Sequence, residues 1–110
     1  MISAQSLLPF MGMKYEIVLT DTAREHYRRL DARGRSLIKK GLKDHLTYEP
    51  TRLSRSRIKR LREIKHPEYR LRIDPYRVFY DVSGRTVVVL AIVPKNKTAK
   101  WLEIYGVKTP

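Results

Sequence analysis

Three arginines on a predicted β-hairpin are the residues of this sequence whose types and spacing best suit chemistry. From residue 68 to residue 82, apolar and charged residues alternate on both sides of Asp74-Pro75, which is typical of two short strands joined by a turn. If these strands pair, Arg70, Arg72 and Arg77 lie close together on one face. Like charges on neighbouring strands destabilise a sheet unless an anion lies across them. The sequence therefore predicts an anion-binding site on this hairpin.

The segment around the hairpin adds positive charge and aromatic side chains. The 26 residues from Arg52 to Arg77 include ten lysines or arginines and only three acids. The aromatic residues in or next to this segment are Tyr69, Tyr76, Phe79 and Tyr80. Arginine binds phosphate through its planar guanidinium, and aromatic rings stack on bases that are turned outward. The pattern predicts a nucleic-acid groove on the concave side of a sheet; the alternative is a solvated basic face.

The length, composition and net charge of the chain fit a small protein with a polyanionic partner. A chain of 110 residues with 42% hydrophobic residues predicts one domain, or one domain plus a tail, with a real core. The formal net charge of +13, from 24 basic and 11 acidic residues, favours nucleic acid, an acidic membrane surface or an acidic protein as partner. The alternative is a protein that is merely basic.

Several classes of site and location are excluded. The absence of cysteine excludes disulfides, cysteine nucleophiles and thiolate metal sites, and it fits a reducing cytoplasm. The longest apolar run, Val87 to Val93, is too short to cross a membrane, and Ile2 to Met11 lacks the cationic start of a signal peptide. Without metal-ligand spacing or a glycine-rich phosphate loop, the sequence predicts no metal and no small-molecule cofactor.

The three histidines differ in their prospects. His45 lies on the apolar stripe of a predicted helix, and His26 lies beside the buried face of another, so both are expected to pack in the core. His66 is predicted in a turn next to the basic hairpin, where an imidazole could act as a general acid or base. The alternative for His66 is simple exposure to solvent.

The first half of the chain predicts a strand and a helical hairpin. Residues 1–12 read as a flexible extension, and alternation from Tyr15 to Leu19 predicts the first strand. One of residues 20–22 then caps a helix that Gly34 is expected to end. A second helix is predicted from about Arg35 to Tyr48, with Pro50 as its end.

The second half predicts further strands and a short helix. A polar basic loop over residues 51–57 leads into one strand over residues 58–65, and the arginine hairpin follows. The apolar run within residues 85–93 predicts a central strand buried on both faces. Residues 98–105 predict a short helix, and the last four residues are expected to fray. The fold class is α+β over residues 13–110, with an N-terminal strand, an antiparallel helical hairpin packed on a curved, mostly antiparallel sheet, and a short C-terminal helix.

This layout resembles the RelE/ParE superfamily of bacterial toxins from type II toxin–antitoxin systems. The resemblance covers roughly residues 13–105 and is carried by the order of elements, by YRLRI and YRVFY on the hairpin, and by the valine-rich strand after it. It implies a co-expressed antitoxin that wraps the toxin. RelE-like members cut messenger RNA on the ribosome, whereas ParE-like members poison DNA gyrase.

The resemblance to the RelE branch also implies roles for single residues. Arg70 and Arg72 match two positions that are commonly lysine, one of which contributes to general-base work and both of which stabilise charge. Arg77 matches the arginine that steadies the scissile phosphate. Lys97 or Lys95 would be the further basic residue after the last strand. Trp101 or Tyr105 would be the aromatic residue that stacks on a base or assists proton transfer. The RNA-binding set predicted around the catalytic residues is Arg55, Arg57, Lys59, Arg60, Arg62, Lys95, Trp101 and Tyr105.

Arginine at the lysine positions changes the expected chemistry. A guanidinium, with a pKa above about 12, is a poor base, although it can neutralise a phosphate. Either His66 accepts the proton, or catalysis consists mostly of orienting the RNA for attack by its own 2′-hydroxyl. A third possibility is a chain that binds RNA and cleaves it weakly.

The sequence leads to one main hypothesis and two rivals. The main hypothesis is a cytoplasmic RelE-like toxin, an endoribonuclease that cuts ribosome-bound messenger RNA without a metal or other cofactor. Its expected partners are the antitoxin, the ribosome and messenger RNA, with no membrane. The rivals are a ParE-like gyrase inhibitor and an RNA- or ribosome-binding module that does not cleave.

Overall fold

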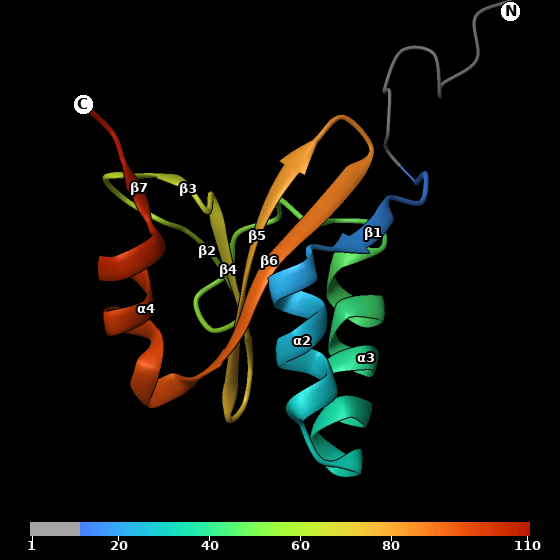
Figure 1. The fold of residues 1–110 in the computed structure, drawn as a ribbon. Coiled ribbons are helices and arrows are strands. Elements are labelled where there is room, and N and C mark those ends of the chain that lie inside the picture. The colour runs from blue at the N-terminus through green and yellow to red at the C-terminus, as the bar shows by residue number, and fades with distance from the viewer. Residues whose placement is uncertain (1–11) are drawn as a thin grey trace, which may run out of the picture.

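A computed structural model describes residues 12–110 and confirms the predicted α+β fold. Helices α2 (Asp21–Arg29) and α3 (Ala32–Leu46) cover one face of a five-stranded sheet, and α4 (Thr98–Tyr105) lies against the other face (Figure 1). The strands of this sheet, in spatial order, are β1 (Glu16–Leu19), β6 (Thr86–Pro94), β5 (Tyr76–Ser83), β4 (Tyr69–Ile73) and β2 (Ile58–Arg60). All neighbouring strands are antiparallel except β1, which runs parallel to β6.

The break between the two helices differs from the prediction. Helix α2 ends at Arg29, and Asp31 caps α3 by accepting a hydrogen bond from Gly34 N at 2.7 Å. Gly34 therefore lies in the first turn of α3 and does not end the first helix. A Cβ atom at Gly34 would lie 2.8 Å from the Tyr76 hydroxyl, so close packing against β5 favours glycine there. Helix α3 ends at Leu46, earlier than predicted and four residues before Pro50.

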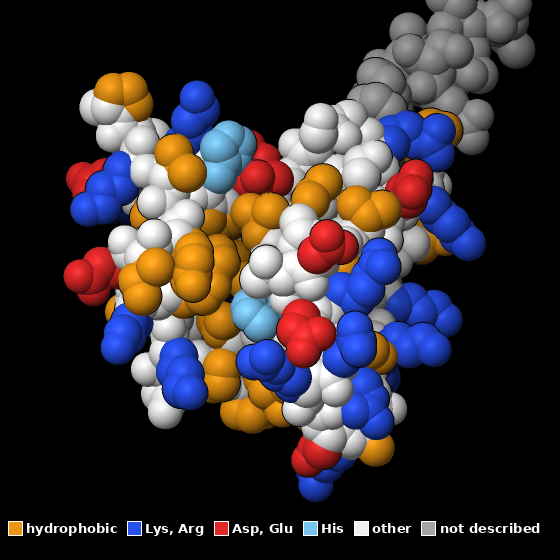
Figure 2. Space-filling view, viewed as in Figure 1, with side chains coloured by type: hydrophobic (Ala, Val, Ile, Leu, Met, Phe, Trp, Pro, Cys, Tyr) orange, Lys and Arg blue, Asp and Glu red, His pale blue; other side chains and the backbone are white. Residues whose placement is uncertain are grey.

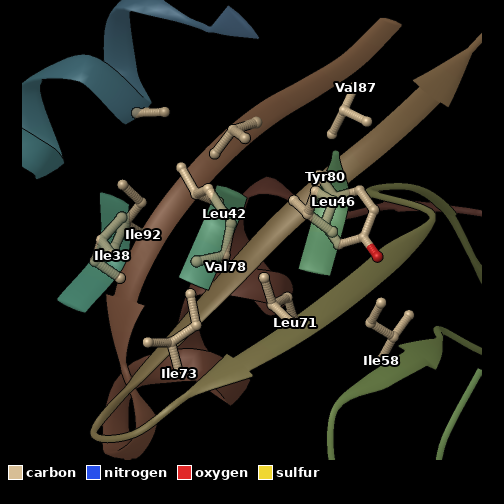
Figure 3. Close-up of a cluster of buried hydrophobic side chains, with 12 residues drawn as sticks. Ile38, Leu42, Leu46, Ile58, Leu71, Ile73, Val78, Tyr80, Val87 and Ile92 are labelled. Carbon is tan, nitrogen blue, oxygen red and sulfur yellow. The ribbon is translucent and has the colours of Figure 1, made fainter. Parts of the chain in front are cut away.

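The main core lies between the sheet and the helical hairpin. Leu71, Val78 and Tyr80 from β4 and β5 meet Leu42 and Leu46 from α3, as Figure 3 shows, and none of them is more than 7% exposed. Because strand side chains alternate between faces, the residues between these apolar positions point toward α4. The core face is thus set by the same alternation that was read from the sequence.

A second, smaller cluster holds α4 on the opposite face. Its buried members are Phe79, Ala91 and Val93, and Trp101 packs on it with its ring 5.1 Å from that of Phe79. Strand β6 contributes to both clusters and lies between β1 and β5, which confirms the predicted central strand buried on both faces. A register shift after Phe79 lets β6 supply Val89 to one face and Ala91 to the other.

Two predictions about short strands are wrong. Residues 58–65 do not form one strand, because β2 ends at Arg60 and β3 (Ile64–His66) belongs to a separate two-stranded sheet. The apolar residues Ile58, Leu61 and Ile64 are spaced by three, which no continuous strand can place on one face. The last residues do not simply fray either, since β7 (Val107–Lys108) pairs with β3.

Two further points concern the ends of the chain and membranes. The predicted flexible extension, residues 1–12, lies outside the described residues except for Gly12. Within residues 12–110, no helix is both long enough and apolar enough to cross a bilayer.

Candidate functional site: a charged sheet face beside α4

The strand register places the three predicted arginines on the face that carries α4. Arg72 lies directly opposite Arg77, and Arg70 lies opposite Phe79, which belongs to the cluster under α4. Lys59 on β2 lies opposite Arg70 and extends this row to the edge of the sheet. Helix α4, which follows the 3₁₀ turn η1 (Lys95–Lys97), contacts β6 and packs on Phe79 of β5, so the part of this face formed by β4 and β2 lies beyond the helix.

Two of the three arginines are paired with a carboxylate of the same chain. Arg72 Nε donates to Asp74 Oδ2 at 2.8 Å, and Arg77 donates to Asp74 Oδ1 at 3.0 Å. Arg77 is only 6% exposed and also donates to the carbonyl of Tyr76. Hydrogen bonds from Arg72, and then from Arg77, lower the pKa of Asp74 to about 2. The anion that the sequence analysis sought outside the protein is, for this pair, Asp74 itself.

Arg70 is the arginine that keeps its charge unpaired. Its Nε atom is buried without a hydrogen-bond partner, and no carboxylate among residues 12–110 pairs with its guanidinium. Burial, and then the positive charges of Arg77 and Arg72, lower the pKa of Arg70. A buried donor left without a partner costs roughly 1–3 kcal/mol. An anion bound to Arg70 would relieve both the missing hydrogen bond and the repulsion.

The predicted RNA-binding residues of the basic segment separate into different places. Arg57, just before β2, donates to the backbone carbonyl of Arg72, but its side chain lines a cavity with His45 and therefore lies toward α3. Arg60 lies on the other face, because it is paired with Tyr69; its guanidinium lies 5.3 Å from the Tyr69 ring centre and donates to the Glu68 carbonyl. Arg55 and Arg62 are exposed in the segments before and after β2. The single groove expected for all of these residues therefore loses Arg57 and Arg60.

The predicted residues at the C-terminal end gather around α4. The backbone N–H of Lys95 donates to Pro75, so η1 lies against the hairpin turn. Lys97 instead lines a shallow cavity of about 310 Å³ on α4, together with Val93, Lys100, Trp101, Ile104 and Tyr105. Hydrophobic side chains over α4 are flanked by lysine and arginine in Figure 2. Lys100 was missed by the sequence analysis, although its spacing from Lys97 and Trp101 fits one side of a helix.

His66 lies at a different end of the hairpin from the paired arginines. It is the last residue of β3, and its Nδ1 atom lies 2.8 Å from Asp81 Oδ2. Asp81 follows Phe79 by two residues on β5, which places it on the same face and roughly 6.6 Å further along the strand. Asp81 was not singled out from the sequence. The hairpin register could have indicated it, since continuing the pairing by one step sets Glu68 opposite Asp81.

The other two histidines have separate surroundings. His26 Nδ1 accepts a hydrogen bond from the backbone N–H of Ile92, and burial lowers the pKa of His26. His45 was expected to pack in the core, but it is half-buried and lines a surface cavity of about 440 Å³ beside Tyr48 and Arg57. No group of three or more histidine and carboxylate side chains within the described chain could hold a metal ion.

The fold of residues 12–110 is similar to that of toxins in solved toxin–antitoxin complexes. The RelBE2 complex from Mycobacterium tuberculosis matches with a TM-score of 0.61 and 27% identity, over 74% of this chain and 98% of that chain. The RelE–RelB complex from Pyrococcus horikoshii matches with a TM-score of 0.62 and 21% identity, over 78% and 100%. The RelB–RelE complex from Methanococcus jannaschii gives 0.58 and 18%, over 76% and 96%.

The sequence itself assigns the family. Residues 17–98 match the family model described as the ParE toxin of the type II toxin–antitoxin system parDE. A search of curated proteins gave no match. The chain therefore belongs to the ParE toxin family, within the RelE/ParE superfamily of type II toxins, and the resemblance drawn from its hairpin is confirmed.

Proposed function

We propose that this toxin is an endoribonuclease that cuts messenger RNA on the ribosome. The observation that carries the proposal is Arg70, a half-buried cation with no counter-ion in the described chain, on a face that also bears Lys59 and the Trp101 ring. A protein surface gains nothing from an unpaired buried guanidinium unless a ligand completes it. The phosphate of an RNA backbone has the charge and the acceptor atoms to do so.

The proposed reaction is an attack by the RNA on its own backbone. The 2′-oxygen forms a bond to the adjacent phosphorus, and the bond from phosphorus to the 5′-oxygen breaks. The 2′-hydroxyl proton passes to a base on the protein, and the departing 5′-oxygen takes a proton from water. The products are a 2′,3′-cyclic phosphate end and a 5′-hydroxyl end. Arg70 would stabilise the negative charge that grows on the phosphate oxygens, and such electrostatic stabilisation usually contributes most of the rate enhancement.

His66 is the proposed base. A guanidinium cannot accept the proton, and the Asp74 and Asp81 carboxylates are already bound to other groups, so the imidazole is the base that we assign. Arg72 and Arg77 would act mainly by keeping the hairpin rigid, since Asp74 already binds both. This differs from the roles that the resemblance implied for them, in which Arg72 stabilises charge and Arg77 steadies the scissile phosphate.

Base stacking and further phosphate contacts are assigned to α4 and η1. Trp101 and Tyr105 have ring centres 5.3 Å apart, and Lys97 lines the same cavity. A base stacked there, with its phosphate near Lys97, would place the neighbouring linkage toward Arg70. Lys95, at the hairpin turn, would contact the backbone further along.

The proposed partners are an antitoxin, the ribosome and messenger RNA, all in the cytoplasm. The solved neighbours are complexes of a RelE toxin with RelB. In this chain, a cavity of about 430 Å³ is lined by Ile17, Leu19 and Leu42 together with Lys39 and Lys43. Its apolar and cationic side chains suit an acidic segment with apolar anchors, the composition expected of an antitoxin that folds on binding.

A primer-extension assay tests the proposal directly. A message is incubated with the toxin, with and without translating ribosomes. New 5′ ends are expected only when ribosomes are present, and adding a co-expressed antitoxin should abolish them. Unchanged RNA in both reactions would contradict the endoribonuclease assignment.

Inhibition of DNA gyrase is the second candidate. It is favoured by the name of the matching family and by Asp74, which already neutralises two of the three predicted catalytic arginines. A gyrase inhibitor would stop supercoiling by purified gyrase at toxin concentrations that leave translated messages intact. The two candidates are thus separated by running both assays on one toxin preparation.

A further inference from the structure

His66 is held by a carboxylate that is itself fixed in place. Asp81 Oδ2 lies 2.8 Å from His66 Nδ1, and Asp81 Oδ1 accepts the backbone N–H of Glu68 at 2.7 Å. The Glu68 carboxylate in turn accepts the backbone N–H of Val82 at 2.9 Å. The Asp81 side chain is 20% exposed, and two contacts from residues 66–68, one to each oxygen, leave its carboxylate little freedom to rotate.

This contact decides which nitrogen of His66 carries the proton. An ionised carboxylate only accepts hydrogen bonds, so Nδ1 must be the protonated nitrogen in the neutral ring. The lone pair is then on Nε2, and no hydrogen bond joins Nε2 to any group within residues 12–110. His66 is 48% exposed, which leaves this nitrogen open to a ligand.

His26 shows the opposite arrangement in the same molecule. Its Nδ1 accepts the backbone N–H of Ile92, so its lone pair is already used and its proton is on Nε2. His26 is therefore suited to holding the structure together. His66 is suited to accepting a proton from outside the chain.

We propose that Asp81 is a positioning residue that fixes the tautomer and orientation of His66 so that Nε2 accepts the 2′-hydroxyl proton. The inference rests on the proposed function. Because Asp81 lies only two strand residues beyond Phe79, the partner of Arg70, one RNA linkage can reach both groups. Its phosphate would bind Arg70 while its 2′-hydroxyl donates to His66 Nε2 over about 2.8 Å.

The alternative role for the pair is to tie β3 to β5. Both roles use the same hydrogen bond, so both make the effect of Asp81 depend on His66, but only the positioning role lowers kcat at an unchanged melting temperature. A double-mutant cycle in kcat, with the melting temperature of each variant, therefore separates them.

The experiment measures kcat and KM for cleavage of ribosome-bound message by the full chain. Asp81→Asn and His66→Gln are each expected to lower kcat about 100-fold, the lower end of the range of general base catalysis, and to leave KM unchanged. The double variant is expected to be no slower than His66→Gln alone. Glu68→Gln, which keeps an acceptor for Val82 N–H and does not touch His66, should retain the parental kcat.

A second measurement is independent of the ribosome. Long-range nitrogen–proton NMR spectra of the toxin should show the proton of neutral His66 on Nδ1, and Asp81→Asn should weaken that preference at an unchanged melting temperature. A proton found on Nε2, additive losses in the double variant, or a parental kcat for Asp81→Asn would each overturn the positioning role. If the parent protein cuts no message, both the proposed function and the positioning role are refuted. If the parent cuts message and the Asp81→Asn variant cuts it equally fast, only the positioning role is refuted.

Discussion

The two faces of the five-stranded sheet differ in whether their buried polar atoms have hydrogen-bond partners. On the face under α3, the hydroxyl of the fully buried Tyr80 donates to the Pro50 carbonyl at 2.6 Å. Burial raises the pKa of Tyr80, so this hydroxyl keeps the proton that it donates to Pro50. On the face toward α4, Arg70 has a buried Nε with no partner at all.

On the face under α3 the buried hydroxyl has a hydrogen-bond partner, whereas on the face toward α4 a buried donor has none within residues 12–110. Buried polar atoms in folded proteins nearly always have a partner, so a single unsatisfied cation needs an explanation. Arg70 and Leu71 are neighbours on β4 and point to opposite faces, which makes them a matched pair for testing what each face does. Stability should depend on the Leu71 face, and activity should depend on the Arg70 face.

The largest expected effect is on the Leu71 face. Leu71→Ala removes a fully buried side chain and leaves a cavity against α3, which should lower the free energy of unfolding by about 2–5 kcal/mol. Urea titration measures this loss, and Leu53→Ala, at a leucine that is 59% exposed, is the control. The cleavage rate per folded molecule should not change. If Leu71→Ala has the same free energy of unfolding as the parent, packing of this side chain against α3 does not stabilise the fold.

Arg70→Ala should do the reverse. The rate of message cleavage is expected to fall about a hundredfold, equivalent to roughly 3 kcal/mol of lost transition-state stabilisation. The melting temperature should stay constant or rise, because the variant removes an unpartnered cation from a row of like charges.

Two comparison variants sharpen the Arg70 test. Arg28→Ala, at an exposed arginine on α2, controls for the loss of one positive charge and should leave cleavage unchanged. Arg70→Lys keeps the charge but loses the planar fork, so an intermediate rate is expected. An Arg70→Ala protein that melts earlier and cuts at the parental rate would show that Arg70 belongs to the structure only.

Local patterns in the sequence were sufficient for most of the fold. The period-two alternation in β4 and β5, and the apolar run in β6, correctly predicted strands and their burial, and the boundaries predicted for α4 are those observed. Pairing between β3 and β7 escaped prediction because it joins segments about 40 residues apart, and β7 has only two residues. The start of α3 was missed because its cap, Asp31, precedes Gly34, and the glycine was taken as a break.

The site could be predicted only in part, because the sequence pattern does not fix the strand register or the side-chain rotamers. Alternation alone predicts that Arg70, Arg72 and Arg77 share a face, and the pairing of β4 with β5 agrees. It does not say which arginine a nearby acid will bind. Asp74 was treated as a turn residue, although a carboxylate at a hairpin tip can reach side chains on both strands.

Asp74 is therefore the next residue to test. Asp74→Asn leaves Arg72 and Arg77 facing each other without a counter-charge, so the variant should be less stable at neutral pH. The pKa of Asp74 is lowered from 3.8 to about 2, so its contribution is complete above pH 4 and is lost as the pH falls toward 2.

The measurement for Asp74 is urea unfolding of parent and variant at several pH values. The difference in unfolding free energy should be constant from pH 7 to pH 5 and should shrink below pH 4. A difference that stays constant down to pH 2 would mean that the two arginines do not depend on the ionised carboxylate.

The smallest expected effect concerns His26, the histidine of α2 that is hydrogen-bonded to the backbone of β6. His26 accepts Ile92 N–H only when Nδ1 is unprotonated, and burial, helped by the charge of Arg29, lowers the pKa of His26 below 6.5. The unfolded chain therefore takes up this proton first as the pH falls. Stability is complete above pH 6.5 and declines on acidification until the folded state is protonated as well. The melting temperature should fall by about 2–4 °C between pH 7 and pH 5.5.

His26→Gln should flatten this decline, because glutamine can accept the same N–H without titrating. His45→Gln serves as the comparison, since burial also lowers the pKa of His45 but no backbone group depends on its lone pair. If His26→Gln and the parent lose stability in parallel, the Ile92 hydrogen bond is not what links acid to unfolding.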